Sequence, residues 1–179
     1  MQKQLFLLLA ISAFLFFPNV SKASGEYTFL SNETRAVNIS NTFSFKITVS
    51  HNMTENIPAE LERVEVILRE GLRYLESSGI NATQCKKLDL KVRYIEYENL
   101  NNRSLMSSLN WSSIGNARLT GIYALEDPKN PTGYGEIFIS SNIETDVIAA
   151  TLRHELLHFL QDATCSIDRN SELLATRFE

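Results

Sequence analysis

Hydrophobic residues recur with two different periods along this chain. In residues 43–50 and 88–97 the apolar side chains alternate with polar ones, which predicts strands with one buried face. Between them, residues 58–78 place apolar side chains at helical spacing, with Pro58 suited to the first turn and Gly79 to the C-terminal cap. The apolar stripe of this predicted helix consists of Leu61, Val64, Leu68, Leu72 and Leu75.

Three more segments have strand patterns. A short strand is expected at 36–40, and the segments 117–125 and 134–140 predict two others later in the chain. The polar stretch 98–116 is rich in asparagine and serine, and its composition predicts a loop.

Two helices are predicted at the C-terminal end. Ser141 and Glu144 have the spacing of a capping box, which predicts a helix that begins there and ends near Asp162. A shorter helix is predicted at 171–179. The pattern as a whole predicts one small α+β domain. Its mixed, mostly antiparallel sheet would have a backing helix, a long second helix and a short C-terminal helix.

The long second helix carries the candidate chemistry. His154-Glu155-Leu156-Leu157-His158 reads H-E-x-x-H and uses two of the three histidines of the chain. Residues four apart lie on one helix face, so the two imidazoles can bind one zinc ion from the same side. Glu155 is then placed to act as a general base on a water molecule. The alternative, two histidines packed on an amphipathic helix, leaves this charged cluster in an apolar segment unexplained.

A catalytic zinc ion needs a third protein ligand. Asp162 is four residues beyond His158, but three successive turns of one helix surround an ion poorly. Asp168 lies in a predicted loop, and Glu172 is near the start of the short C-terminal helix. Glu179 is the last residue of the sequence, and fraying at a chain end would make it a poor ligand.

The motif and its context resemble the zincin metallopeptidases. Glu172-x-x-Ala175, after the H-E-x-x-H helix, resembles the gluzincin branch, although its distance from His158 is shorter than in the well-known members. The resemblance implies a secreted zinc-dependent metallopeptidase that hydrolyses peptide bonds. It implies His154, His158 and Glu172 as zinc ligands, with Glu155 as the catalytic base.

The resemblance also implies where a substrate would bind. In that family the strand before the active-site helix tends to be the sheet edge that pairs with a peptide, which here is 134–140. Tyr134 on this strand is then the preferred catalytic donor to the oxyanion. Tyr123, Arg153 and Arg177 are the other candidates for that role.

Other roles and functions stay open at this stage. Gln161 and Asp162 are candidates for orienting a liganding imidazole or for capping the helix end. A catalytically inactive zincin-like binding protein is the main alternative function. A zinc hydrolase acting on a non-peptide amide is another.

The beginning of the chain has the pattern of an export signal. Lys3 is followed by an apolar run at 5–17 and then by a small-x-small cleavage pattern. These features predict a signal peptide at 1–23 and a mature domain at 24–179, exported to the periplasm or secreted. No later segment is apolar enough to predict membrane insertion after cleavage.

Export makes a disulfide between Cys85 and Cys165 the favoured state, with two buried thiols as the alternative. A net charge of −4 and the absence of a basic stripe argue against a nucleic-acid partner, so a peptide or protein substrate is expected. Six N-x-S/T sequons are potential glycosylation sites: Asn32, Asn38, Asn52, Asn81, Asn102 and Asn110.

Overall fold

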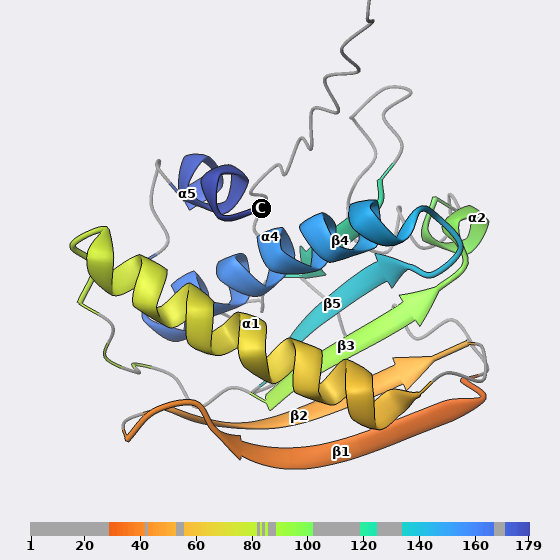
Figure 1. Cartoon of the computed structure of the whole chain (residues 1–179), viewed down its shortest axis with the longest axis horizontal. Coiled ribbons are helices and arrows are strands. Elements are labelled where there is room, and N and C mark those ends of the chain that lie inside the picture. Colours follow the sequence, from red (N-terminus) through yellow and green to blue (C-terminus); the bar gives the residue numbers. More distant parts are fainter. Residues whose placement is uncertain are drawn as a thin grey trace, which may run out of the picture.

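The protein folds around one five-stranded sheet. The computed structural model describes residues 29–41, 43–52, 56–81, 83, 85, 89–101, 119–124, 134–166 and 171–179. The strands are β1 (Ser31–Asn38), β2 (Ser44–His51), β3 (Asp89–Ile95), β4 (Gly121–Ala124) and β5 (Tyr134–Ser140). The helices are α1 (Ile57–Ser77), α2 (Tyr97–Leu100), α4 (Thr145–Ala163) and α5 (Ser171–Phe178) (Figure 1). The predicted signal peptide, Asp168, Asn102 and Asn110 lie outside the described residues.

The strand order is β1-β2-β3-β5-β4. The outer pairs β1–β2 and β4–β5 are antiparallel, whereas the central pairs β2–β3 and β3–β5 are parallel. The α+β class and the mixed sheet are therefore confirmed. Two of the four strand pairs are antiparallel and two are parallel.

The position of β5 corrects the expectation for the sheet edge. Strand 134–140 is internal, because β3 pairs with one side of it and β4 with the other. The edge next to the long second helix is β4 instead. Both segments are apolar and both are buried, so their patterns alone did not distinguish the outer strand from the inner one.

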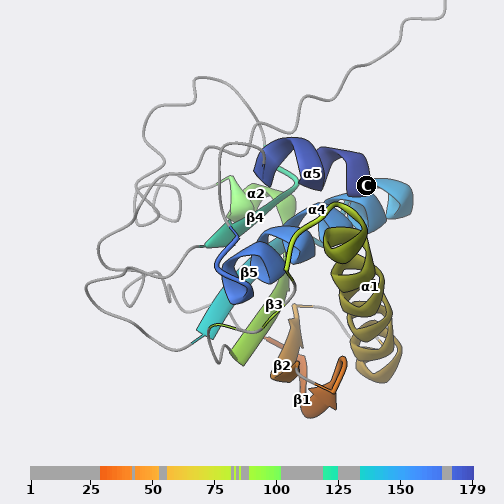
Figure 2. The ribbon, with the colours of Figure 1, turned by 90° about the vertical axis from the view of Figure 1, so that its left-hand side faces the viewer.

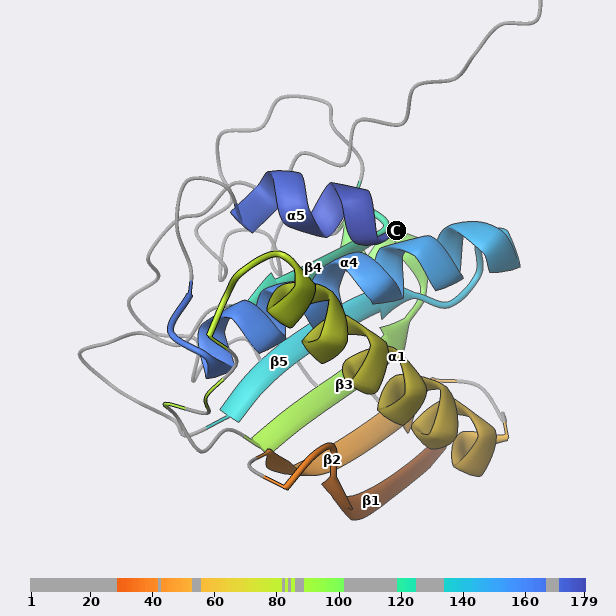
Figure 3. The same ribbon diagram turned by 60° about the vertical axis from the view of Figure 1, so that its left-hand side comes forward.

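The two long helices cover the same face of the sheet. Figure 2 shows α1 and α4 side by side on that face, and Figure 3 shows α5 lying against α4 on the side away from the strands. The predicted stripe of α1 is buried throughout, and so is the apolar side of α4. The core between the layers includes Phe45, Ile47, Val92, Ile137, Leu156 and Phe159.

Local signals set the ends of α1, with Pro58 and Gly79 placed as expected and Asn56 as an additional N-cap. The Asn56 side chain accepts a hydrogen bond from the Ala59 N–H, and Pro58 occupies the first turn. Gly79 follows the last turn with φ of +83°, a conformation that glycine adopts without strain.

The capping box predicted for α4 is not formed. The N-cap residue is Glu144, and no side chain caps the helix. Ser141 instead bonds to neighbouring segments just after β5, because its N–H donates to the Ile95 carbonyl at the end of β3 and its hydroxyl bonds the Asn52 side chain. The helix therefore begins at Thr145, after the sheet pairing has ended.

Other boundaries agree only in part, since the short strand expected at 36–40 is β1, which begins earlier, at Ser31, and ends at Asn38. The predicted loop at 98–116 begins with the short helix α2, and its later part lies outside the described residues. The C-terminal helix α5 matches its predicted range within one residue. None of the helices within the described ranges is long and apolar enough to cross a membrane.

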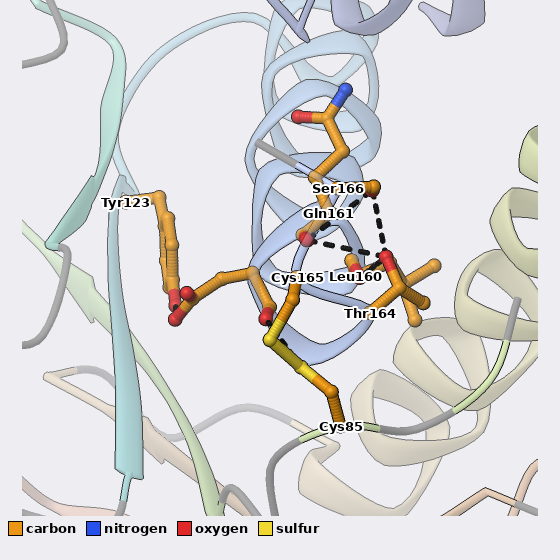
Figure 4. Close-up of a disulfide and its surroundings, with 8 residues drawn as sticks. Cys85, Tyr123, Leu160, Gln161, Thr164, Cys165 and Ser166 are labelled. Atoms are coloured by element: carbon orange, nitrogen blue, oxygen red, sulfur yellow. Dashed lines mark hydrogen bonds between the residues drawn. A yellow bond between two sulfur atoms is a disulfide. The ribbon is translucent and has the colours of Figure 1, made fainter. Parts of the chain in front are cut away.

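The predicted disulfide is present. Cys85 and Cys165 are bonded, with their Cα atoms 6.0 Å apart. Figure 4 shows this bond at the C-terminal end of α4, and the Cys85 N–H also donates to the carbonyl of Ala163 over 2.9 Å. Both cysteines are exposed. The bond therefore attaches the segment before β3 to the end of the helix that carries the histidines.

Candidate metal centre

Two buried imidazoles face one another on α4. His154 and His158 are one turn apart, and only 1% and 3% of their surfaces are exposed. Their Nε2 atoms lie 3.1 Å apart, with the two rings inclined at 76°. Helix geometry alone accounts for this pairing, as the sequence predicted.

Glu172 in the first turn of α5 completes a group of three ligands. Its Oε1 lies 3.3 Å from Nε2 of His154, and its Oε2 lies 3.3 Å from Nε2 of His158. The potential ligand atoms of the three residues all lie within 4.8 Å of one another. This group could hold a metal ion, with both carboxylate oxygens directed at the two nitrogens.

The chemistry of Glu172 supports that fit. Both of its carboxylate oxygens are buried, and neither accepts a hydrogen bond of good geometry from the part of the chain that the structure describes. Buried carboxylate oxygens are costly unless a donor or a cation compensates them. Two imidazole nitrogens and one carboxylate are also a familiar donor set for catalytic zinc.

The outward-facing nitrogens of the two imidazoles are both engaged. Nδ1 of His154 lies 2.6 Å from Oε1 of Glu179, and Nδ1 of His158 lies 2.9 Å from Oε1 of Gln161. An acceptor at Nδ1 places the proton there and leaves Nε2 available for a metal. Glu179 is thus a partner of His154 rather than a member of the ligand group. The proposed orienting role of Gln161 is matched by this contact.

Gln161 also connects the two helices. Its Nε2 donates to the backbone carbonyl of Ser171 over 3.0 Å, directly before Glu172. The same side chain therefore contacts one histidine and fixes the start of α5. The sequence drew attention to Gln161 but not to Ser171, since a backbone acceptor has no residue-type signature.

Arg153 fixes the other end of α5. Its Nε donates to the Phe178 carbonyl over 3.1 Å, and its Nη1 lies 2.8 Å from Oε2 of Glu70 on α1. The guanidinium also lies over the Phe178 ring. These contacts give Arg153 a structural role beside Glu179. Arg177, the other candidate cation, is exposed on α5.

The charges of the ligand group are strongly coupled. Burial lowers the pKa of His154, but the nearby Glu172, Glu155 and Glu179 outweigh this effect and raise the pKa to about 9. Burial raises the pKa of Glu172, yet His154 and His158 hold it at about 2. These shifts favour an ion pair between His154 and Glu172 in the metal-free protein, and a metal ion would take the place of the imidazolium proton.

Glu155 lies beside this group and is also buried, with 5% of its surface exposed. Burial raises its pKa, whereas the imidazoles and a backbone hydrogen bond lower it, and the net shift is upward. That hydrogen bond comes from the N–H of Tyr123 on β4 and measures 2.7 Å to Oε2. A carboxylate with a raised pKa and a fixed orientation suits general-base chemistry.

One sequence expectation, the role of Tyr134, is corrected here. The ring of Tyr134 lies under the Lys91 ammonium, on the strand face opposite the one that packs on α4. The structure therefore does not bring Tyr134 to the histidines. Asp162 accepts a hydrogen bond from the Tyr123 hydroxyl over 2.9 Å, so this carboxylate connects α4 to β4. The third histidine, His51, stacks on Tyr94 in a separate part of the sheet.

The contact between Gln161 and His158 leads to a first prediction. Gln161→Ala should weaken zinc binding about tenfold, because outer partners of liganding histidines typically contribute at least that much. Competition with a chromogenic chelator measures the affinity. Gln161→Glu is the matched control, since its carboxylate can still accept from Nδ1 of His158 while losing the donor to Ser171. Equal affinities for Gln161→Ala and the wild type would contradict the orienting role.

Comparisons of the chain with protein-family models, with curated proteins and with solved structures found no match.

Proposed function

We propose that this protein is a zinc-dependent metallopeptidase that hydrolyses peptide bonds. The observation that carries the proposal is the convergence of His154, His158 and Glu172 next to the buried carboxylate of Glu155. Two imidazoles and a carboxylate are the ligand set of several catalytic zinc sites, in which a fourth position stays open for chemistry. The metal and the reaction are proposals that rest on this geometry and on the H-E-x-x-H spacing.

The ligands and the base have separate tasks in this proposal. A bound zinc ion supplies Lewis acidity, which polarises a carbonyl and makes a water molecule easier to deprotonate. Glu155 receives the water proton on its carboxylate and delivers it to the leaving amine. Gln161 and Glu179 contact Nδ1 of the two imidazoles and so keep both rings oriented toward the ion.

The test of this proposal is a peptide-library digest by the purified protein. Zinc measured by elemental analysis should be close to one ion per chain, and cleavage should stop with a chelator and resume when zinc is added. The cleaved peptides would also define the specificity. A protein that binds no zinc, or that cleaves equally well with the chelator, would refute the proposal.

Glu172 provides a second prediction. Glu172→Ala should lower zinc affinity by more than about a hundredfold, since a direct ligand contributes at least as much as the outer partners of liganding histidines. Glu172→Gln separates charge from shape, and we expect it to bind zinc weakly while folding normally. Dialysis against a zinc buffer followed by elemental analysis gives the affinities. An unchanged zinc content in Glu172→Ala would redirect the search to Asp168 or Glu179.

The proposal places the enzyme outside the cytoplasm. The Cys85–Cys165 bond supports this location, because such bonds persist in oxidising compartments. The sequence of residues 1–23 supports it independently. Sequencing the N-terminus of the exported protein checks it, and a chain that begins near Ser24 is the expected result.

A further inference from the structure

Tyr123 contacts α4 through two different parts of the residue. Its backbone N–H donates to Glu155, and its phenolic O–H donates to Asp162 over 2.9 Å. Glu155 and Asp162 are seven residues apart, which is two turns along the same side of the helix. Both carboxylates are almost fully buried. One residue of β4 thus spans two turns of the helix that carries the metal group.

The first of these contacts depends on where β4 lies. β4 is a short edge strand of four residues, Gly121–Ala124, and its only strand partner in the described part of the chain is β5. Tyr123 directs its N–H to Glu155, so this donor does not strengthen the pairing with β5. A short edge strand with few ladder bonds needs another attachment if its backbone is to hold a carboxylate in place.

The side chain of Tyr123 is confined enough to provide that attachment. Its ring packs edge-on against Phe159 of α4, with the ring centroids 6.2 Å apart. A Cβ atom added to Gly135 would lie 3.0 Å from the Tyr123 hydroxyl oxygen and 2.7 Å from the Phe159 ring. The phenol therefore occupies a closely fitted space between β5 and α4. Figure 4 shows Tyr123 beside the last turn of α4, with the disulfide near the same turn.

We infer that Tyr123 is a positioning residue for the catalytic base, with Asp162 as its anchor. The bond from the hydroxyl to Asp162 fixes β4 against α4, and the backbone N–H then orients Glu155. This inference rests on the proposed peptidase function. It extends that function, because it gives a buried carboxylate and a tyrosine outside the ligand group an expected effect on the rate.

Tyr123→Phe is the direct test, because it removes the hydroxyl and keeps the ring. We expect kcat to fall about tenfold, since a small displacement of a catalytic group is costly. KM and the zinc content should stay the same, because Gln161 and Glu179 orient the ligands independently. Hydrogen exchange of the residue 123 amide should become faster in the metal-free protein, which gives a readout that does not require activity.

The anchor is tested by two substitutions of Asp162. Asp162→Ala should reproduce the kcat loss of Tyr123→Phe, whereas Asp162→Asn should restore most of it, because an amide oxygen also accepts the hydroxyl proton. Combining Tyr123→Phe with Asp162→Ala should cost no more than either change alone, as expected when both remove the same interaction.

Tyr94→Phe is a matched control. Tyr94 is also a buried strand tyrosine, and its hydroxyl donates over 2.9 Å to a carboxylate, here Glu60 on α1. This variant loses the same kind of bond in a part of the fold away from α4, so its kcat should match the wild type. A similar loss of kcat in Tyr94→Phe would mean that the effect of Tyr123→Phe is only structural.

The remaining outcomes are distinct. An unchanged kcat in Tyr123→Phe, or a loss in Asp162→Asn as large as in Asp162→Ala, would overturn the positioning role while the peptidase function stands. A wild-type protein without chelator-sensitive cleavage would overturn both the peptidase function and the positioning role. The digest of the wild-type protein gives this result before any variant is made.

Discussion

Glu155→Gln is expected to abolish peptide hydrolysis while leaving zinc bound. Glutamine cannot accept the water proton, and loss of a general base typically lowers a rate by about 10² to 10⁴-fold. The amide oxygen of the introduced glutamine could still accept the hydrogen bond that the Tyr123 N–H donates to Glu155 over 2.7 Å, so this buried contact would remain. The measurement is kcat on the best peptide from the library digest, together with zinc content.

Glu62→Gln is the matched control for this result. Glu62 is exposed on α1, so the same change of charge there should leave both rate and zinc content unchanged. Full activity in Glu155→Gln would remove Glu155 as the base. Lost zinc in that variant would instead indicate that Glu155 belongs to the ligand group.

Replacing both Cys85 and Cys165 by serine is expected to cause the largest loss of stability. The bond closes a loop across a sequence separation of 80 residues. In the chain-entropy account such a loop stabilises the fold by about 4 kcal/mol. Urea unfolding of the metal-free double variant should show this decrease in the free energy of unfolding. Metal-free protein is required because a bound ion would add its own stabilisation.

The disulfide should also affect the metal group. Cys165 lies at the start of the segment that leads from α4 to Glu172, and the last turn of α4 carries Gln161 and Asp162. We therefore expect weaker zinc binding in the double variant. A reducing thiol should produce the same two losses in the wild type and no further change in the variant. A loss of stability under about 1 kcal/mol would show that the loop is already restrained in the unfolded chain.

The contacts of α5 explain why one short helix affects both histidines. Glu172 in its first turn faces the two Nε2 atoms, and Glu179 just beyond its last turn binds Nδ1 of His154. Gln161 fixes the start of the helix and Arg153 fixes its end. Substitutions of Gln161 or Arg153 should therefore alter the geometry of the metal group, although neither residue is a proposed ligand.

The sequence by itself determined those features that depend on neighbours along the chain. The stripe of α1, its Pro58 and Gly79 end signals, and the limits of β5 follow from periodicity and from local backbone preferences. The pairing of His154 with His158 follows from the pitch of one helix. The choice of Glu172 came from a resemblance to gluzincins, and the geometry agrees with it.

The tertiary structure decided which distant residues meet. β4 rather than β5 is the outer strand, Tyr134 faces away from α4, and a backbone N–H of Tyr123 holds Glu155. Strand order and helix docking depend on how apolar faces pack over the whole chain. Two buried apolar strands have equivalent local patterns, and a backbone donor has no side-chain signature. The sequence therefore specified the chemical groups, while long-range packing determined their partners.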